Sequence, residues 1–149
     1  MSESNKLRSI AVRPATREDL HAIAAIQAAS PEASQWEPSE YLRYDCVVAI
    51  AEEKVAAFLV SRETAPGERE ILNLAVDPPW RCRGMARQLL EGELSRPKTH
   101  WFLEVRESNA AAQRFYESLG FRAAGRRENY YRSLGEGSPE GAIVMTFFS

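Results

Sequence analysis

The sequence has few of the features that define secreted or membrane proteins. It contains only two cysteines, Cys46 and Cys82, too few for a disulfide framework and typical of a reducing compartment. Its longest apolar runs, residues 46–51 and 55–60, have the length of strands and are far too short to cross a bilayer. Residues 1–8 are polar with no apolar run behind them, unlike a signal peptide. We therefore expect a cytoplasmic protein without a membrane partner.

An excess of basic charge is also missing. The net charge of the 149 residues is −2, so no overall positive field attracts nucleic acid. The two histidines, His21 and His100, have no partners at metal-ligand spacing, and we expect no metal site. Hydrophobic content of 44% and charged content of 27% are ordinary for a globular protein. The length suits one core, so we expect a single domain over 1–149, with a flexible tail at 1–8.

Apolar periodicity, proline and glycine divide the chain into seven predicted strands and four predicted helices. The strands are expected at 9–13, 45–51, 55–61, 70–77, 100–106, 121–127 and 141–148. Helices are expected at 16–27, from about 84 to 94 and at 109–119, and a turn-rich link at 30–42 is expected to lead into a further short helix. The three strands between 45 and 77 predict an antiparallel meander. The order strand–helix–strand from 71 to 106 predicts one parallel crossover, and the fold class is α/β (α+β) with a mixed sheet.

The helix near residue 84 has arginines where a helix disfavours positive charge. Arg81, Arg83 and Arg87 crowd its first turn, next to free N–H groups and the positive end of the helix dipole. The crossover places this end at the carboxyl end of a strand, where α/β sheets bind ligands. A bound polyphosphate would turn the repulsion into a clamp, and Gly84 and Ala86 would let it approach the backbone. The alternative is that the arginines lie in solvent, paired with Glu91 or Glu93.

Two common phosphate-binding patterns, GxxxxGK[ST] and GxGxxG, are absent. Residues 81–86 read Arg-x-x-Gly-x-Ala after "AVDP", which resembles the pyrophosphate loop of the GCN5-related N-acetyltransferases. The segment "FLEVRESNAAAQRFYESLGFRAAGRRENYY" at 102–131 is similar to ribosomal-protein-alanine N-acetyltransferases and other N-terminal acetyltransferases. The resemblance implies that family's fold, a mostly antiparallel sheet that splays in the middle, and acetyl-coenzyme A as co-substrate.

The resemblance also implies which residues hold the coenzyme. Asn109 matches a residue of the family that hydrogen-bonds the coenzyme arm. Leu74, Ala75 and Val76 match the strand of the family whose backbone pairs with that arm. The implied coenzyme-binding residues are Leu74, Ala75, Val76, Arg81, Cys82, Arg83, Gly84, Met85, Ala86, Arg87 and Asn109.

Two residues of the second half are candidates for proton transfer. Ala112, Phe115, Tyr116 and Leu119 share one helix face, so the hydroxyl of Tyr116 points inward and needs a partner. Glu104 is a carboxylate in the middle of an otherwise apolar strand. The resemblance implies that Glu104 is the general base for the amine and Tyr116 the general acid for the departing thiolate. The alternatives are an ion pair between Glu104 and Arg106, and a structural tyrosine bonded to a backbone carbonyl.

The acceptor is less defined by the sequence. The resemblance implies that Tyr130 and Tyr131 of "RENYY" line a groove for a peptide N-terminus, with Trp36 as the opposite wall. The tyrosines could instead pack the base of a hairpin. We expect an acyltransferase for the N-terminal alanine of a small-subunit ribosomal protein. An acetyltransferase for a small-molecule amine, or a non-catalytic sensor of acyl-coenzyme A, are the alternatives; a sensor need not keep both Glu104 and Tyr116.

Overall fold

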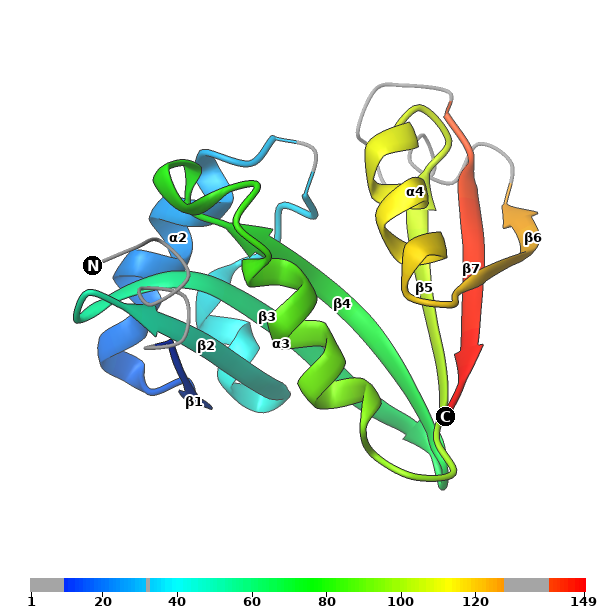
Figure 1. The fold of residues 1–149 in the computed structure, drawn as a ribbon, viewed down its shortest axis with the longest axis horizontal. Coiled ribbons are helices and arrows are strands. Elements are labelled where there is room, and N and C mark those ends of the chain that lie inside the picture. Colours follow the sequence, from blue (N-terminus) through cyan, green and yellow to red (C-terminus); the bar gives the residue numbers. More distant parts are fainter. Residues whose placement is uncertain (1–9, 32, 128–139) are drawn as a thin grey trace. The chain divides into compact units, whose positions relative to one another are not determined.

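The computed structural model describes residues 10–31, 33–127 and 140–149, in two compact units. The first unit comprises Met1–Arg62 and Ile71–Ser95, and the second comprises Glu63–Glu70 and Arg96–Ser149. Seven strands follow the order β1-β2-β3-β4-β5-β7-β6 (Figure 1). β1–β2, β2–β3, β5–β7 and β6–β7 are antiparallel and β4–β5 is parallel, which confirms the predicted mixed, mostly antiparallel sheet.

The elements have the following bounds. The strands are β1 (Ala11–Pro14), β2 (Asp45–Ala51), β3 (Lys54–Ala65), β4 (Glu68–Val76), β5 (His100–Arg106), β6 (Arg122–Arg127) and β7 (Ala142–Phe148). The helices are η1 (Arg17–Asp19), α2 (Leu20–Ala28), η2 (Pro38–Arg43), η3 (Pro78–Trp80), α3 (Met85–Leu94) and α4 (Ala110–Ser118), of which those labelled η are short 3₁₀ helices.

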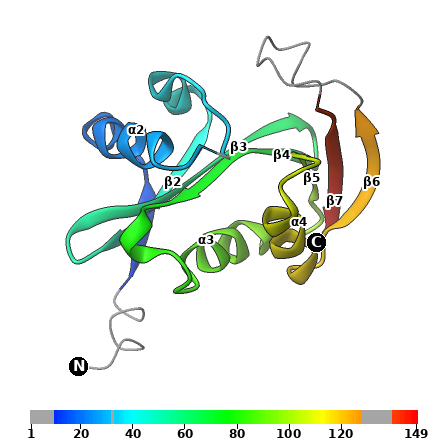
Figure 2. The ribbon, with the colours of Figure 1, turned by 90° about the horizontal axis from the view of Figure 1, so that it is seen from above.

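In the first unit, helices cover both faces of the strands. Figure 2 shows α2 on one face of β2, β3 and β4 and α3 on the other. The α2 face buries a cluster formed by Ile23, Ile26, Tyr41, Cys46, Val48, Phe58, Val60 and Ala75. α3 buries Met85, Leu89, Leu90 and Leu94, which form an apolar stripe of helical period. The buried side chains hold α3 against the strands, with its N-terminus close to the carboxyl end of β4, which precedes it in the chain.

The start of the first helical region is held by a carboxylate. The Thr16 N–H donates to Asp19 at 2.8 Å, as expected of a capping box with Asp in the place of Glu. Arg13 donates to both carboxylate oxygens of Asp19, at 2.7 and 3.0 Å. The Arg13 guanidinium lowers the pKa of Asp19 below its ordinary value. The edge strand β1 is thereby joined to the helical region that follows it.

In the second unit, β7 lies between β5 and β6 and α4 lies against these strands (Figure 1). The Asn109 side chain accepts the Ala112 N–H at 3.1 Å, so Asn109 is the N-cap of α4. Gly120 follows α4 with a φ of +104°, a left-handed conformation that glycine adopts readily after a helix end. A side chain at Gly120 would also meet the Phe147 ring at 2.9 Å.

Some expectations differ from the structure in detail. The second helical segment is the 3₁₀ helix η2, whose first residue is Pro38. β3 is longer than predicted, because its polar end, from Arg62 to Ala65, continues the strand into a hairpin. The expected tail at 1–8 lies outside the described residues, and the single domain stays a prediction. Within residues 10–31, 33–127 and 140–149, no helix has the length and apolarity needed to cross a membrane.

Candidate functional site

The carboxyl-terminal half of β4 has a backbone that the β4–β5 ladder does not use. The parallel register joins Glu68 to Glu70 with His100 to Phe102, and β4 continues to Val76 beyond it. The Asp77 N–H donates to Ala56 of β3 at 2.8 Å, so the N–H of Val76, one residue earlier, points to the other edge of the strand. The Leu74 N–H donates to the side chain of Asn73 at 3.0 Å. Val76 is therefore a candidate hydrogen-bond donor toward a ligand.

The loop between β4 and α3 presents backbone N–H groups. Cys82 and Gly84 have φ angles of +62° and +78°, and Gly84 is the N-cap of α3. The Gln88 N–H donates to the Gly84 carbonyl at 3.0 Å, so the N–H groups of Met85 and Ala86, which come before this first helical turn closes, have no acceptor within the helix. A Cβ at Gly84 would have no atom within 4 Å. This geometry, open at a helix N-terminus, suits an anion.

The three arginines of this loop have different surroundings. Arg81 binds carbonyl oxygens at the ends of two elements: Nε donates to Val76 at 3.1 Å and Nη2 to Ala29 at 2.8 Å. Its Nη2 also donates to Ser30 Oγ at 2.9 Å. Arg81 thus joins the end of β4 to the end of α2. The Arg83 guanidinium lies 5.4 Å from the Trp80 ring, and Arg87 pairs with Glu91 at 3.4 Å, one of the two ion pairs considered from the sequence.

Tyr116 lies on the inward face of α4 between aromatic rings. Its ring centroid is 5.2 Å from that of Phe115 and 5.5 Å from that of Phe121. Among the described residues, its hydroxyl has no hydrogen-bond partner, which disfavours the structural alternative of a bond to a backbone carbonyl. Burial raises the pKa of Tyr116 above its ordinary value of 10.0, so the phenol keeps its proton at neutral pH.

Glu104 does not pair with Arg106, the partner considered from the sequence. Arg127, the last residue of β6, donates to Glu104 Oε1 at 2.7 Å, and the Glu104 side chain is 16% exposed. Arg106 instead faces Glu140 at 3.7 Å. The pair between Glu104 and Arg127 was not predicted because 23 residues separate them in the sequence. It depends on the strand order β5-β7-β6, which was not predicted either.

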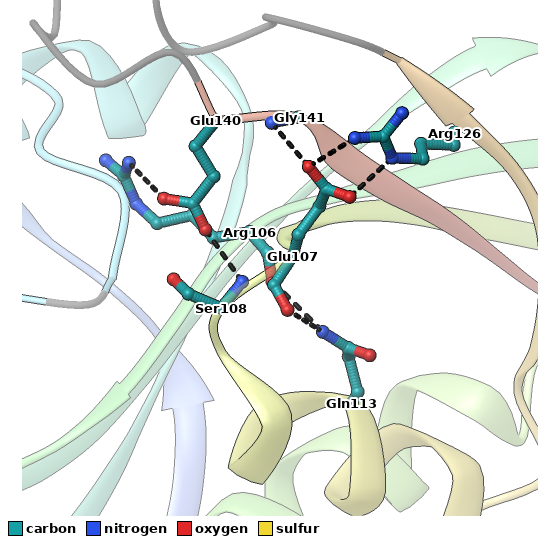
Figure 3. Close-up of polar contacts among 7 residues, drawn as sticks. All are labelled: Arg106, Glu107, Ser108, Gln113, Arg126, Glu140 and Gly141. Atoms are coloured by element: carbon teal, nitrogen blue, oxygen red, sulfur yellow. Dashed lines mark hydrogen bonds and ion pairs between the residues drawn. The ribbon is translucent and has the colours of Figure 1, made fainter.

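The residues after β5 form a polar cluster, drawn in Figure 3. Glu107 binds Arg126 through both carboxylate oxygens and accepts the Gly141 N–H at 2.8 Å. The backbone N–H of Ser108 donates to Glu140 Oε1 at 2.7 Å. Gln113 of α4 donates to the Glu107 carbonyl at 2.9 Å. The cluster therefore joins β6, β7 and α4 at the carboxyl end of β5.

This cluster also shifts the titration of its carboxylates. Hydrogen bonding from Arg126, with a smaller contribution from the Gly141 N–H, lowers the pKa of Glu107. Hydrogen bonding from Ser108 lowers the pKa of Glu140. Gly141 has no room for a side chain, since a Cβ there would lie 2.7 Å from Glu107 and 2.8 Å from the Arg127 carbonyl. Because their pKa values are lowered, the carboxylates of Glu107 and Glu140 are ionised at neutral pH and act as hydrogen-bond acceptors.

The expected acceptor residues are described only in part. Trp36 is 46% exposed in the segment between α2 and η2. Tyr130 and Tyr131 lie outside the described residues. Gln27, Tyr41 and Asn73 form a buried polar cluster, bonded to the Trp36 carbonyl, that was not predicted from the sequence. The signal was a polar residue at position 73 on the buried face of β4, between Ile71 and Ala75.

The structural features above agree with the comparisons to known proteins. The model of the acetyltransferase (GNAT) family matches residues 7–121. The chain is 41% identical over 107 residues to the ribosomal protein bS18-alanine N-acetyltransferase of Salmonella typhimurium. The aligned region covers 69% of this chain and 70% of that protein.

Solved structures give the same result. The ribosomal-protein-S18-alanine N-acetyltransferase of Escherichia coli superposes with a TM-score of 0.78 and 32% identity, covering 93% of each chain. Ard1 of Thermoplasma volcanium superposes with a TM-score of 0.83 and 25% identity, covering 94% of this chain and 97% of that one. The expected fold is therefore confirmed.

Proposed function

Because this chain belongs to the acetyltransferase (GNAT) family, and is thus an acyltransferase, we propose that it acetylates the N-terminal α-amine of a protein. The acetyl group comes from acetyl-coenzyme A, and the acceptor is the N-terminal alanine of a small-subunit ribosomal protein. The observation that carries this acceptor is the 41% identity to an enzyme named for the alanine of ribosomal protein bS18. The proposed place of action is the cytoplasm, with no metal, nucleic acid or membrane required.

The residues around the start of α3 fit a pyrophosphate. The N–H groups of Met85 and Ala86 at the start of α3 and the left-handed residues Cys82 and Gly84 form the backbone part of the proposed site. Arg83 and Arg87 supply positive charge. Arg81 holds the loop to Val76, so we assign it to shaping the site as well. The strand residues Leu74, Ala75 and Val76 pair with the coenzyme arm, and Nδ2 of the Asn109 side chain, which has no partner among the described residues, is available to it.

The proposed chemistry is direct attack of the amine on the thioester carbonyl carbon. Glu104 takes a proton from the attacking amine, directly or through water. The Val76 N–H stabilises the negative charge that develops on the carbonyl oxygen as the new C–N bond forms. Tyr116 gives its proton to the sulfur as the C–S bond breaks. The role of acid is supported by the protonated state of the Tyr116 phenol at neutral pH and by its lack of a structural hydrogen-bond partner among the described residues.

The acid–base chemistry of the acceptor favours an α-amine. At pH 7, removing a proton from an α-amine of pKa near 8 costs about 1 kcal/mol, whereas a lysine amine near 10.4 costs about 4–5 kcal/mol. A single carboxylate such as Glu104 is sufficient as the base for an α-amine, whose deprotonation costs less.

Mass spectrometry of peptides after incubation with acetyl-coenzyme A tests the proposal. A short peptide that begins with alanine is compared with the same peptide blocked at its α-amine and carrying a free lysine. We expect acetylation of the first peptide only. Equal acetylation of the blocked peptide contradicts the N-terminal assignment, and acetylation of small amines such as polyamines in place of both peptides supports the alternative of a small-molecule acceptor.

A further inference from the structure

Three polar side chains are buried together inside the first unit, where apolar residues would be expected. Gln27 of α2, Tyr41 of η2 and Asn73 of β4 are 6%, 1% and 5% exposed. The Tyr41 hydroxyl donates to Gln27 Oε1, and Asn73 Nδ2 lies 3.0 Å from the Tyr41 oxygen and 3.2 Å from Gln27 Oε1. The three elements are thus joined by one hydrogen-bonded cluster.

The remaining groups of this cluster bind the backbone of the segment between α2 and η2. Gln27 Nε2 donates to the Trp36 carbonyl at 2.6 Å, and Asn73 Nδ2 donates to the Ser34 carbonyl at 2.9 Å. Asn73 Oδ1 accepts the Leu74 N–H of β4 at 3.0 Å. Burial raises the pKa of Tyr41 to about 12, so its phenol remains a donor at physiological pH. Each polar group of the cluster therefore has a partner.

Residues 34–37 have no regular secondary structure, so side chains must supply the hydrogen bonds that hold them. Gln35 adds a second attachment, since its Nε2 donates to the carbonyls of Ser30 and Ala33 at 3.1 Å. Arg81 donates to the Ala29 carbonyl at the end of α2 and to the Val76 carbonyl at the end of β4. The strand residues from Leu74 to Val76 thus lie between two links, at Asn73 and Arg81, to the segment that carries Trp36.

Apolar side chains of similar volume could replace the bonds among the three side chains at little net cost, but they would leave the carbonyls of Ser34 and Trp36 without their donors. What the polar cluster adds is geometry. It fixes the carbonyls of Ser34 and Trp36 relative to the β4 backbone at a defined register.

We propose that Gln27, Tyr41 and Asn73 are positioning residues that hold the segment 34–36, and with it Trp36, in register with β4 and thereby set the affinity for the acceptor. The inference rests on the proposed function, since it takes Trp36 as a wall of the acceptor site and β4 as the strand that pairs with the coenzyme. None of the three residues contacts a substrate in this proposal. They act through the backbone of the segment.

The test uses Gln27→Met, which conserves volume and removes the bond to Trp36. We expect amide hydrogen exchange of residues 33–37 to accelerate at least about tenfold, as for the loss of a hydrogen bond, with exchange in β2 and β3 unchanged. The KM for the acceptor peptide should rise by a similar factor, while the dissociation constant of acetyl-coenzyme A stays within about twofold and kcat within about threefold.

A matched pair of tyrosines provides the control. Tyr41→Phe removes a hydroxyl of the cluster, and Tyr44→Phe removes one that has no hydrogen bond among the described residues. Tyr41→Phe should raise the acceptor KM and accelerate exchange at 33–37, and Tyr44→Phe should do neither. These variants keep the test usable if Gln27→Met does not fold.

Three results would overturn the inference. They are unchanged exchange at 33–37 in both cluster variants, accelerated exchange with an unchanged acceptor KM, and a loss of coenzyme affinity equal to the loss of acceptor affinity. If the wild-type protein acetylates no peptide α-amine, the proposed function fails by itself, and the exchange result still decides whether the cluster holds the segment.

Discussion

Arg127 at the end of β6 donates a hydrogen bond to Glu104 of β5 at 2.7 Å. The carboxylate proposed as the general base is therefore already in an ion pair. Such a pair orients the carboxylate, as a base requires, but it also offers a purely structural explanation of Glu104. Because Arg127 is half-exposed, the pair contributes little to stability, so the two explanations differ in what each partner's removal does to catalysis.

Glu104→Gln and Arg127→Gln separate these explanations. As a general base, Glu104 should contribute on the order of 10²–10⁴-fold, so Glu104→Gln should lower kcat/KM by that range near neutral pH. The loss should shrink as pH rises past the α-amine pKa near 8, because the free amine no longer needs a base. Arg127→Gln breaks the same ion pair and leaves the carboxylate, and it should retain most of the activity. Equal losses without any dependence on pH would return Glu104 to a structural role.

Tyr116→Phe removes one hydroxyl and keeps the ring between Phe115 and Phe121. Because that hydroxyl has no partner among the described residues, the melting temperature should hardly change. We expect kcat to fall at least about tenfold, with the affinity for acetyl-coenzyme A preserved. Single-turnover kinetics and calorimetry measure the two quantities. Wild-type turnover, when the chemical step limits the rate, would contradict the role of acid.

Local patterns were sufficient to predict most elements. β2 and β5 have the predicted bounds, because each is a short apolar or alternating run between residues that disfavour strands. α4 begins after Asn109 and ends before Gly120, both of which carry a local conformational preference that is readable in the sequence. The parallel pairing of β4 and β5 was predicted from the order strand–helix–strand between residues 71 and 106.

Contacts between distant residues could not be predicted in the same way. The placement of β7 between β5 and β6, the pair Glu104–Arg127 and the cluster of Gln27, Tyr41 and Asn73 all depend on strand order or on separations of 14 to 46 residues. Arg81 shows the same limit. Its position in the loop indicated a phosphate ligand, whereas its hydrogen bonds to α2 and β4 are set by tertiary structure.

Gly84 tests the anion site at α3. At a φ of +78°, Gly84→Ala should lower the free energy of unfolding by about 1–2 kcal/mol, whereas Gly84→Asn should cost less because asparagine tolerates this conformation. Both side chains would occupy the open space at the helix N-terminus, so both should weaken acetyl-coenzyme A binding. Gly92→Ala, in the interior of α3, should stabilise the protein by up to about 1 kcal/mol without affecting binding. Wild-type affinity in Gly84→Asn, measured by calorimetry, would exclude the loop as the pyrophosphate site.

The Glu107 cluster predicts a pH-dependent contribution to stability. Arg126 and the Gly141 N–H lower the pKa of Glu107 below its ordinary value of 4.5, so the folded protein favours the ionised form more than the unfolded chain does. The contribution is complete above about pH 4.5 and is lost as the pH falls through the lower value of the folded state. Glu107→Gln should therefore melt below the wild type at pH 7, and the difference should close on acidification. Glu117→Gln makes the same change on the exposed surface of α4 and should produce no such difference. A gap for Glu107→Gln that is constant from pH 7 to pH 3 would mean that side-chain shape, and not the ionised carboxylate, holds β6 and β7 at this point.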